Sequence, residues 1–312
     1  MLMNDLGEPI ACPVCANAVH AADSLRDYVA PFNAQKYALH RCGNCELGFW
    51  TPLQIDPKFY EDEGFAAYAD YHAGERPFPP WCVPFFEKIP ISKGRLLDVG
   101  CGDGAFLSRA KLAGFEAWGM DLDKNSVQAA MTVYELGNIT QSSLQEFVAS
   151  CKREDRMFDV ITFFEVLEHQ DQPSEFIDQI LSILKPGGYM AGSVPNGRRF
   201  LAAIDRKISP GDLPPHHFLW FSERTLGLLL SRKNFSSIVI HPSGNISLAE
   251  LRDKFAALFY RVMAWQNPSL LGRGLLFPAA GFAALLLWLG YRIQPAHLYF
   301  HAVRPLGAEN GG

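Results

Sequence analysis

The chain has 312 residues, of which 48% are hydrophobic and 20% charged, and a formal net charge of −5. This length accommodates one α/β domain of roughly 200 residues with a smaller unit beside it. The acidic balance argues against nucleic acid as a partner and favours a small or neutral one. The chain does not open with a basic stretch followed by an apolar run, so we expect no secretory signal and a cytoplasmic location. In the cytoplasm thiols stay reduced, and paired cysteines usually indicate a metal site or catalysis.

Two C-x-x-C turns stand near the start of the chain. Cys12 and Cys15 form the first, Cys42 and Cys45 the second, with 26 residues between them. Two such turns complete a closed tetrahedral S₄ site, typical of structural zinc. The sequence therefore predicts a zinc ribbon in residues 1–50, with structural disulfides and unrelated free thiols as the alternatives.

Residues 51–93 are rich in proline and aromatic side chains. Tyr68 and Tyr71 are expected to close over a cofactor, and packing of this linker against the next domain is the alternative. Cys82, Cys101 and Cys151 have no partner at metal-ligand spacing and are interpreted as small apolar residues.

From residue 94, short apolar runs alternate with helical stretches, which is typical of a parallel sheet with crossover helices. A helix expected from Pro173 should stop before the sequence KPGG at residues 185–188. Another is expected from Ser247, with Glu250 at capping-box spacing. Strands are expected near residues 95–99, 116–121, 138–141, 158–164, 189–194, 236–241 and 297–303.

The first expected strand leads into a glycine-rich loop. Gly100, Gly102 and Ala105 satisfy the dinucleotide pattern G-x-G-x-x-[GA], so a nicotinamide cofactor is an alternative. However, Asp98 and Asp103 flank the loop, which contains no lysine or arginine. These carboxylates would repel a pyrophosphate. They suit S-adenosylmethionine, whose sulfonium and ammonium groups are both positive.

Asp121 ends the second expected strand, about 20 residues beyond the loop, where an acidic side chain accepts hydrogen bonds from both ribose hydroxyls. This placement predicts an adenosine ribose without selecting the cofactor. A helix N-cap is the alternative role, and it better describes Asp123.

Several short motifs occur in a family order and spacing across roughly residues 90–240. They are LDVGCGDG at 97–104, GMD at 119–121, FDVI at 158–161, EVLEH at 165–169, LKPGG at 184–188 and VPN at 194–196. With these motifs the sequence resembles class I S-adenosylmethionine-dependent methyltransferases, especially the ubiquinone-biosynthesis O-methyltransferases. The paired cysteines are similar to the zinc-binding N-terminus of some sugar C-methyltransferases.

This resemblance implies a Rossmann-like α/β fold, with a seven-stranded sheet, helices on both faces and an antiparallel final strand. It implies that Gly100 and Gly102 let the backbone approach the methionyl part of the cofactor. Many relatives carry an acidic residue where this chain has Ser143, which offers a weaker hydrogen bond to adenine. The candidate cofactor-binding residues are Asp98, Gly100, Gly102, Asp121, Leu122, Ser143, Phe164, Tyr68 and Tyr71.

Methyl transfer to a hydroxyl requires alignment of the acceptor and removal of its proton. His169, just past the fourth expected strand, is the first candidate base, with Glu168 orienting it. By resemblance, Glu165, Glu168 and His169 match a set that holds a divalent ion, and oxygen ligands suit Mg²⁺. Structural buttressing of the loop is the alternative.

Two further groups follow the fifth expected strand. His216 and His217 lie where relatives often carry a histidine that faces the acceptor, and fixing the loop is an equally weighted alternative. A basic cluster is interpreted as a solvated loop in preference to a site for an anionic acceptor: Arg198, Arg199, Arg206 and Lys207.

Residues 274–291 carry no charge over 18 positions. As a helix they would extend roughly 27 Å, close to the ~30 Å bilayer core. A strand at 297–303 must nevertheless return to the same sheet, so we expect peripheral contact with a membrane or a lipid-like acceptor in preference to a span. Plain packing is the alternative.

The sequence thus predicts four regions: a zinc ribbon (1–50), a linker and lid (51–93), a methyltransferase core (94–243), and an apolar helical insertion with the final strand (244–312). The predicted activity is methylation of a hydroxyl, or less favourably a carbon, of a small or lipid-linked acceptor. An NAD-dependent oxidoreductase and a non-catalytic cofactor-binding scaffold or sensor are the alternatives.

Overall fold

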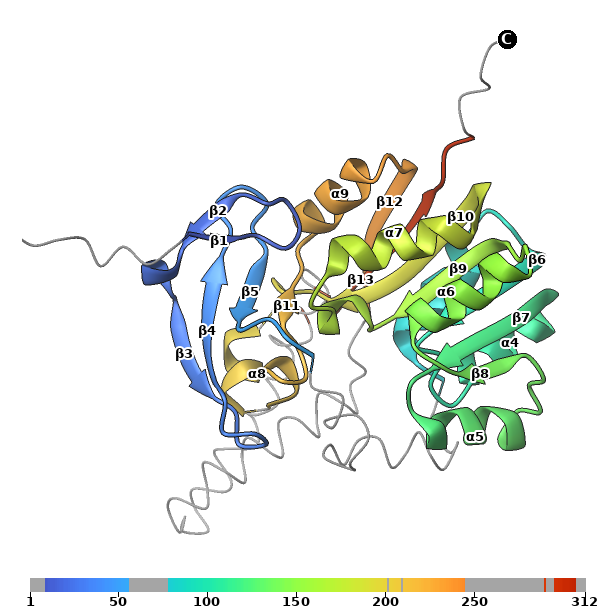
Figure 1. The fold of residues 1–312 in the computed structure, drawn as a ribbon, viewed down its shortest axis with the longest axis horizontal. Helices are drawn as coiled ribbons and strands as arrows, with labels where there is room; N and C mark the ends of the chain where they lie inside the picture. Colours follow the sequence, from blue (N-terminus) through green and yellow to red (C-terminus); the bar gives the residue numbers. More distant parts are fainter. Residues whose placement is uncertain are drawn as a thin grey trace, which may run out of the picture.

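The computed structural model describes residues 9–55, 78–200, 202–208, 210–244, 289 and 295–306 (Figure 1). Tyr68, Tyr71, the helix expected from Ser247 and the apolar segment 274–291 lie outside the described residues. No helix within the described ranges is long and apolar enough to cross a membrane.

A seven-stranded sheet forms the larger part of the fold, with strand order β12-β13-β10-β9-β6-β7-β8. Its strands are β6 (Gly94–Val99), β7 (Phe115–Asp121), β8 (Ile139–Gln141), β9 (Phe158–Phe164), β10 (Leu184–Pro195), β12 (Ser236–Ser243) and β13 (His297–Val303). The neighbours from β8 to β10 pair in parallel, whereas β13 runs antiparallel to both β10 and β12. This arrangement confirms the predicted sheet and its antiparallel final strand.

Helices cover both faces of this sheet, as predicted (Figure 1). Buried side chains of α6 (Leu144–Arg153), α7 (Pro173–Ile183) and α9 (Glu223–Arg232) share one core. Those of α3 (Val83–Lys88), α4 (Ala105–Leu112) and α5 (Lys124–Val133) share the other. Cys82, Cys101 and Cys151 are buried in these two cores, which confirms their interpretation as apolar residues.

The KPGG sequence ends α7 at Ile183, as predicted, but β10 begins earlier than expected. Its pairing with β9 shifts register between Leu184 and Tyr189, so the glycines form an irregularity within the strand. Gly187 has φ +74°, and its N–H donates to the Arg304 carbonyl at 2.9 Å. The sequence marks the helix end correctly, whereas the bulge depends on pairing with a distant segment.

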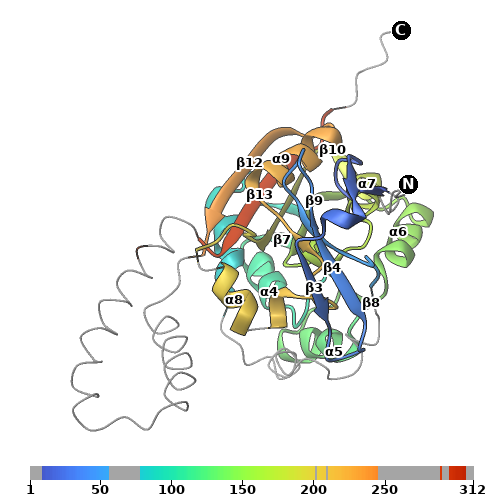
Figure 2. The same cartoon turned by 90° about the vertical axis from the view of Figure 1, so that its left-hand side faces the viewer.

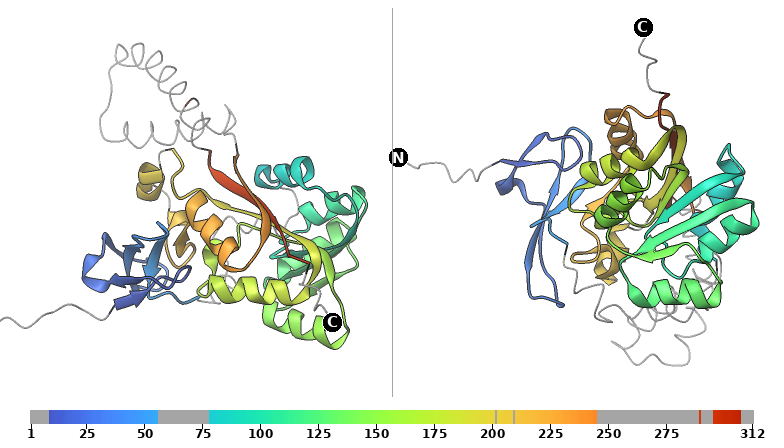
Figure 3. Two further views of the ribbon diagram at one scale, coloured as in Figure 1. Left: turned by 90° about the horizontal axis from the view of Figure 1, so that it is seen from above. Right: turned by 45° about the vertical axis from the view of Figure 1, so that its right-hand side comes forward.

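The N-terminal part forms two small sheets at the opposite end of the fold from β7 and β8 (Figures 1 and 3). One pairs β1 (Pro9–Ala11) with β2 (Ala18–His20). The other has the order β11-β5-β4-β3, with β3 (Arg26–Val29), β4 (Lys36–Arg41), β5 (Gly48–Thr51) and β11 (Leu219–Trp220). In Figure 2, β3 and β4 cross in front of the larger sheet.

Strand β11 connects the small sheet to the larger domain. It pairs with β5 of the small sheet and belongs to the segment that precedes α9. Trp50 on β5 is fully buried and meets the Trp220 ring edge-on at a centroid distance of 5.6 Å. One continuous apolar core includes the four paired cysteines, Trp50 and the buried face of α9. The remaining short helices are η1 (Ala21–Asp23), η2 (Pro80–Cys82), η3 (Leu167–His169), α8 (Ala202–Ile208) and η4 (Pro210–Asp212).

Candidate active site

A cavity of about 370 Å³ opens where β6, β7 and β9 end. Ligands bind at this edge of open α/β sheets, because the loops that follow parallel strands gather there. Eight of the predicted catalytic and cofactor-binding residues line it: Asp98, Gly100, Gly102, Asp121, Leu122, Ser143, Phe164 and His169.

The glycine loop turns tightly beneath this cavity. The N–H groups of Gly100 and Cys101 both donate to the Met120 carbonyl, at 2.8 and 3.1 Å. Gly100 has φ +72°, and a Cβ atom there would lie 2.7 Å from Cγ2 of Val166. Only glycine fits this conformation and spacing, which leaves the backbone open toward the cavity.

Asp121 is held rigidly at the end of β7. Its Oδ2 accepts from the Gly102 N–H at 2.8 Å, and its Oδ1 accepts from the Asp123 N–H at 2.9 Å. Burial raises the pKa of this carboxyl, and these backbone hydrogen bonds oppose the rise. Each oxygen retains a lone pair for a ribose hydroxyl. Asp123 caps α5, accepting from two backbone N–H groups, as expected.

The ionisable groups that line the cavity among the described residues are acidic or neutral. Asp98, Asp121, Asp123 and Glu165 contribute carboxyls, and the described lining contains no lysine or arginine. Asp98 is buried and accepts from the Thr162 hydroxyl at 2.7 Å. A cavity of this charge fits a cationic sulfonium and ammonium, whereas a pyrophosphate would be repelled.

Ser143 and Leu122 line the cavity with different exposures. The Ser143 hydroxyl accepts from the Glu146 N–H, and Glu146 Oε2 accepts from the Ser143 N–H at 2.9 Å, which makes a capping box on α6. The same hydroxyl donates to Glu146 Oε2 at 2.8 Å. Its contact with adenine therefore stays a prediction, because the hydroxyl proton is already engaged. Leu122 is 57% exposed, which leaves an apolar surface free to cover a flat ring.

Glu165 directly follows β9 and lines the cavity with a positive φ of +57°. Its Oε1 accepts from the Ser193 hydroxyl at 2.7 Å, and its Oε2 lies 3.1 Å from Nδ1 of His297. The His297 ring packs against Trp81 at a centroid distance of 5.2 Å. Burial raises the pKa of Glu165, but His297 and Ser193 outweigh burial and the net pKa is lowered.

Sequence analysis missed Ser193 and His297. They follow Glu165 by 28 and 132 positions and meet it only because β10 ends and β13 begins beside it. No spacing rule connects such residues. The one available signal was that His297 opens the last expected strand at the edge where the cofactor was predicted.

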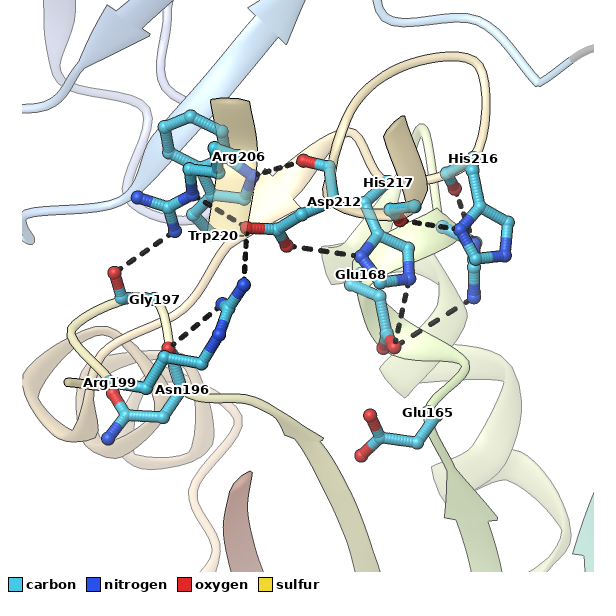
Figure 4. A network of polar contacts seen from close by, with 12 residues as sticks. Glu165, Glu168, Asn196, Gly197, Arg199, Arg206, Asp212, His216, His217 and Trp220 are labelled. Atoms are coloured by element: carbon cyan, nitrogen blue, oxygen red, sulfur yellow. Dashed lines mark hydrogen bonds and ion pairs between the residues drawn. The ribbon is translucent and has the colours of Figure 1, made fainter. Parts of the chain in front are cut away.

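Glu168 forms a second polar cluster with His169, His216 and His217. Figure 4 shows Glu168, His216 and His217 of this cluster. The Glu168 carboxyl is fully buried, and its Oε1 lies 3.8 Å from Nε2 of both His169 and His217. His169 Nδ1 contacts the His216 carbonyl at 2.5 Å, so that carbonyl holds the ring. Because 3.8 Å exceeds a hydrogen-bond distance, the orientation of His169 by Glu168 stays a prediction.

The pKa of Glu168 is raised well above its usual range by burial and by the nearby Glu165 carboxylate. Burial, followed by the neighbouring His216 and His217, holds the pKa of His169 well below its usual range. Burial, followed by the neighbouring His217, lowers the pKa of His216 to about 3. His169 is thus neutral and a weak proton acceptor near pH 7, contrary to the expectation from its type alone.

The basic cluster after β10 is not a solvated loop, so that interpretation is wrong for two of its members. Arg199 Nη2 and Arg206 Nε bind Asp212 Oδ2 at 3.1 and 2.6 Å, and both side chains are nearly buried. Arg206 also stacks over Trp220, 3.5 Å from the ring centroid. Arg198 pairs with Glu46 at 2.7 Å, while Lys207 is exposed.

The magnesium set implied by resemblance does not fit the geometry. The Glu165 carboxylate contacts Ser193 and His297, whereas Glu168 and His169 belong to the histidine cluster. The carboxylate-carboxylate-histidine set is therefore divided between two separate networks, and we derive no step from magnesium.

The four paired cysteines converge as predicted. Cys12 Sγ lies 3.5 Å from Cys45 Sγ, Cys15 Sγ lies 3.5 Å from Cys42 Sγ, and all four atoms are within 4.8 Å of one another. Tetrahedral zinc with Zn–S bonds of ~2.3 Å requires sulfur atoms about 3.8 Å apart. A hydrogen bond from the Cys45 thiol lowers the pKa of Cys12 to about 5, despite burial. These residues fit a structural zinc ion.

The second cysteine turn packs on the N-terminus of α9. The Thr225 hydroxyl donates to the Cys45 carbonyl at 2.8 Å, and Arg224 Nη2 donates to the Asn44 carbonyl at 2.9 Å. The metal site therefore supports the helix that covers one end of the large sheet.

Comparison with known proteins gives a family. A family model described as "Methyltransferase domain" matches residues 76–239, which is more than half of the chain. The chain is 32% identical over 127 residues to the mitochondrial ubiquinone biosynthesis O-methyltransferase of Dictyostelium discoideum, covering 37% of this chain and 39% of that one. It is 30% identical over 119 residues to the ubiquinone biosynthesis O-methyltransferase of Ralstonia nicotianae, covering 37% and 50%. The matches thus span half or less of these two relatives.

Solved structures share the fold. A phosphoethanolamine N-methyltransferase 2 from Haemonchus contortus, in complex with S-adenosyl-L-methionine, aligns with a TM-score of 0.52 at 17% identity, covering 81% of this chain and 60% of that one. An S-adenosylmethionine-dependent methyltransferase from Thermotoga maritima aligns with a TM-score of 0.50 at 13% identity, covering 80% and 97%. Together with the glycine loop, Asp121 and the acidic cavity, these findings show that the chain belongs to the methyltransferase-domain family, in its S-adenosylmethionine-dependent class.

Proposed function

We propose that the protein transfers the methyl group of S-adenosylmethionine to a hydroxyl of a small or lipid-linked acceptor. The observation that carries this proposal is that one cavity combines the acidic cradle of Asp98 and Asp121 with the bound carboxylate of Glu165. The carboxyls of Asp98 and Asp121 suit the cation that donates the methyl group. The Glu165 carboxylate can accept the proton that a hydroxyl must lose.

The cofactor would be held by this chain's own groups. Asp121 would accept the ribose hydroxyls, and the open backbone at Gly100 and Gly102 would approach the methionyl part. S-adenosylmethionine supplies an activated methyl group on sulfur. The protein has to align the acceptor oxygen in line with that carbon and exclude competing water.

Glu165 is our first choice for the proton acceptor, in place of His169. Its pKa is lowered, so it is ionised near pH 7, and His297 and Ser193 fix its orientation. In the proposed step the acceptor O–H proton passes to the Glu165 carboxylate as the oxygen–methyl bond forms, and the sulfonium–methyl bond breaks to leave a neutral thioether. His169 also lines the cavity and remains the alternative acceptor; the pKa of both groups is lowered, so the preference for Glu165 rests on its charged, fixed carboxylate.

The cavity also has an apolar part to its lining, which favours an apolar acceptor. Its apolar lining residues include Ile55, Trp81, Phe164, Val166 and Phe176. The curated relatives are named for ubiquinone biosynthesis and O-methylation, and ubiquinone is a ring that carries an apolar prenyl chain. A hydroxylated, prenylated ring is therefore the acceptor class that we favour, with carbon methylation as the weaker alternative.

The test uses labelled S-adenosylmethionine, the full chain, and a prenylated catechol beside the same molecule with its hydroxyls already methylated. We expect transfer to the free catechol alone. Equal transfer to the blocked analogue would indicate carbon methylation, and transfer to neither would reject this acceptor class.

Glu165→Gln tests the proton acceptor. We expect kcat to fall roughly 10²–10⁴-fold with unchanged affinity for S-adenosylmethionine. A comparable loss in His169→Gln, with Glu165→Gln nearly unaffected, would return the role to His169.

A further inference from the structure

We propose that a second, smaller cavity binds a phosphoryl group, carried either by a small phosphate ester or by free phosphate. This cavity, which we call the ribbon–core cavity, has a volume of about 110 Å³. Residues of β4, β5 and the second cysteine turn line it, together with residues of the loop after β10, α8 and β11. It thus lies between the N-terminal sheets and the large domain. The inference does not depend on the proposed acceptor or on the methyl-transfer step.

The charges that line the ribbon–core cavity differ in sign from those of the cofactor cavity. Arg41, Arg198 and Arg206 contribute guanidinium groups to the described lining, and Glu46 contributes its one carboxylate. The described lining of the cofactor cavity has several carboxyls and no lysine or arginine. A basic cavity therefore stands out on a chain whose formal net charge is −5. Its field favours an anion.

Two of these arginines can reach a ligand at little cost. Arg41 is exposed at the end of β4 and makes no ion pair with the described residues. Arg198 is 54% exposed at its side chain, and its guanidinium contacts Glu46 at 2.7 Å. Its backbone is fixed, because the Arg198 N–H donates to Asn196 Oδ1 at 2.9 Å. An exposed ion pair contributes little stability, so an anion can replace Glu46 on this guanidinium.

Arg206 fixes one side of the cavity (Figure 4). Its guanidinium stacks over the Trp220 ring, 3.5 Å from the centroid, and donates to the Gly197 carbonyl at 3.0 Å. Its Nε binds Asp212 at 2.6 Å, which offsets part of its charge. Arg206 therefore holds this side in place, and the hydrogen bonds to the anion would come from Arg41 and Arg198.

The geometry favours phosphate over a carboxylate. A guanidinium presents its N–H groups as a planar fork, which binds two oxygens of an oxyanion at once. Arg41 comes from β4 and Arg198 from the loop after β10, so the two forks approach from different segments. A tetrahedral phosphate has oxygens for both, whereas a planar carboxylate has only two.

The size of the cavity limits what it can enclose. One water molecule takes up roughly 30 Å³ of liquid. A cavity of about 110 Å³ therefore encloses a group of the size of phosphate and is too small for a nucleotide. The remainder of a phosphate ester would extend into solvent.

Calorimetric titration of the full, zinc-loaded chain with inorganic phosphate and with phenyl phosphate tests the proposal, with acetate as the comparison anion. We expect phosphate to bind and acetate to bind more weakly or not at all. High ionic strength should weaken the binding. Binding of phenyl phosphate as well would identify an ester as the ligand class, and binding of inorganic phosphate alone would identify the free ion.

The phosphate should bind equally well when S-adenosylmethionine is present at saturation, because the two cavities have different linings. This arm also separates the inference from the proposed function. A chain that does not bind S-adenosylmethionine can still bind phosphate, and the reverse also holds.

Arg41→Gln and Arg198→Gln should each weaken phosphate binding roughly 10–100-fold. Glu46→Gln should strengthen it roughly two- to fivefold, because the variant loses the carboxylate that competes for Arg198. The matched control is Arg232→Gln, an exposed arginine at the end of α9 that does not line the cavity and should leave binding unchanged. Zinc content and Tm of each variant report whether the chain is folded.

Four results would overturn the proposal. They are equal binding of phosphate and acetate, no binding of phosphate, phosphate binding that survives in both Arg41→Gln and Arg198→Gln, and phosphate binding that S-adenosylmethionine abolishes. The Glu46→Gln variant gives the sharpest check of sign, because weaker binding in a folded variant would contradict competition between Glu46 and the anion.

Discussion

At the scale of single residues, the glycine loop restricts the residue type most strictly. Gly100→Ala would force a left-handed φ on alanine and place its Cβ 2.7 Å from Val166. We expect stability to fall by about 1–3 kcal/mol, together with a loss of affinity for S-adenosylmethionine, measured by thermal unfolding and titration.

The matched control is Gly137→Ala, where a Cβ would meet nothing within 4 Å. Val166→Ala in the Gly100→Ala background should restore part of the lost stability by relieving the contact. Equal effects of the two glycine substitutions would mean that loop geometry does not govern binding.

The residues that sequence reasoning found and those it missed differ in one physical respect. Local geometry is encoded in residues that are close in the sequence. This explains why sequence reasoning found Gly100 in a turn, Asp121 at a strand end and the cysteine pairs in their C-x-x-C turns. Glu165 was singled out, but its partners Ser193 and His297 come from other strands. The ion pair of Arg206 with Asp212 depends on the path of the loop after β10. Hydrophobic periodicity in the sequence does not predict that path.

At the scale of elements, Asp159 ties together three neighbouring strands. Its carboxylate at the start of β9 accepts from the Arg95 N–H of β6 and from Lys185 of β10, both at 2.8 Å. Burial raises its pKa, but the contacts with Lys185 and Arg95 outweigh burial and leave the pKa below its usual value. A depressed pKa stabilises the fold above the unfolded value near 3.8, and that contribution is lost as pH falls through the folded value.

Asp159→Asn should therefore cost stability at neutral pH, by about 1 kcal/mol after allowance for partial exposure. The difference from the unaltered protein should shrink as pH falls below about 4. Chemical denaturation at a series of pH values measures both. A cost that grows on acidification would contradict the assigned contacts.

The element pattern itself was largely predictable, because buried parallel strands and amphipathic helices differ in period. All seven strands of the large sheet fall where expected: β9 and β13 match to the residue, and the other five differ by one to five residues at an end. The largest difference is the start of β10, where the glycines bulge to pair with the chain beyond β13. Strand β11 was not foreseen, since two residues carry no alternation.

At the scale of the whole molecule, the cysteine ribbon and the large domain share a core. Strand β11 pairs with β5, and Thr225 and Arg224 bind the second cysteine turn. Removal of zinc by a strong chelator should therefore lower the Tm of the entire chain in one cooperative transition, as seen by calorimetry. A separate early transition, with the remaining unfolding unchanged, would show that the ribbon is an independent unit.

Thr225→Val tests the same coupling without touching a metal ligand. It removes the hydroxyl that donates to the buried Cys45 carbonyl at 2.8 Å while keeping the side-chain shape. We expect a loss of about 1–3 kcal/mol in unfolding free energy and earlier release of zinc during denaturant titration. Unchanged zinc release would mean that α9 does not support the knuckle.

The central claim is that the acidic cavity binds S-adenosylmethionine through Asp121. Calorimetric titration of the full chain with S-adenosylmethionine and with NADH, repeated on Asp121→Ala, tests it most directly. The structure predicts binding of S-adenosylmethionine alone, weakened at least tenfold in the variant by loss of the ribose contacts, about 1.4 kcal/mol or more. Binding of NADH, or an affinity for S-adenosylmethionine that Asp121→Ala leaves unchanged, would contradict it.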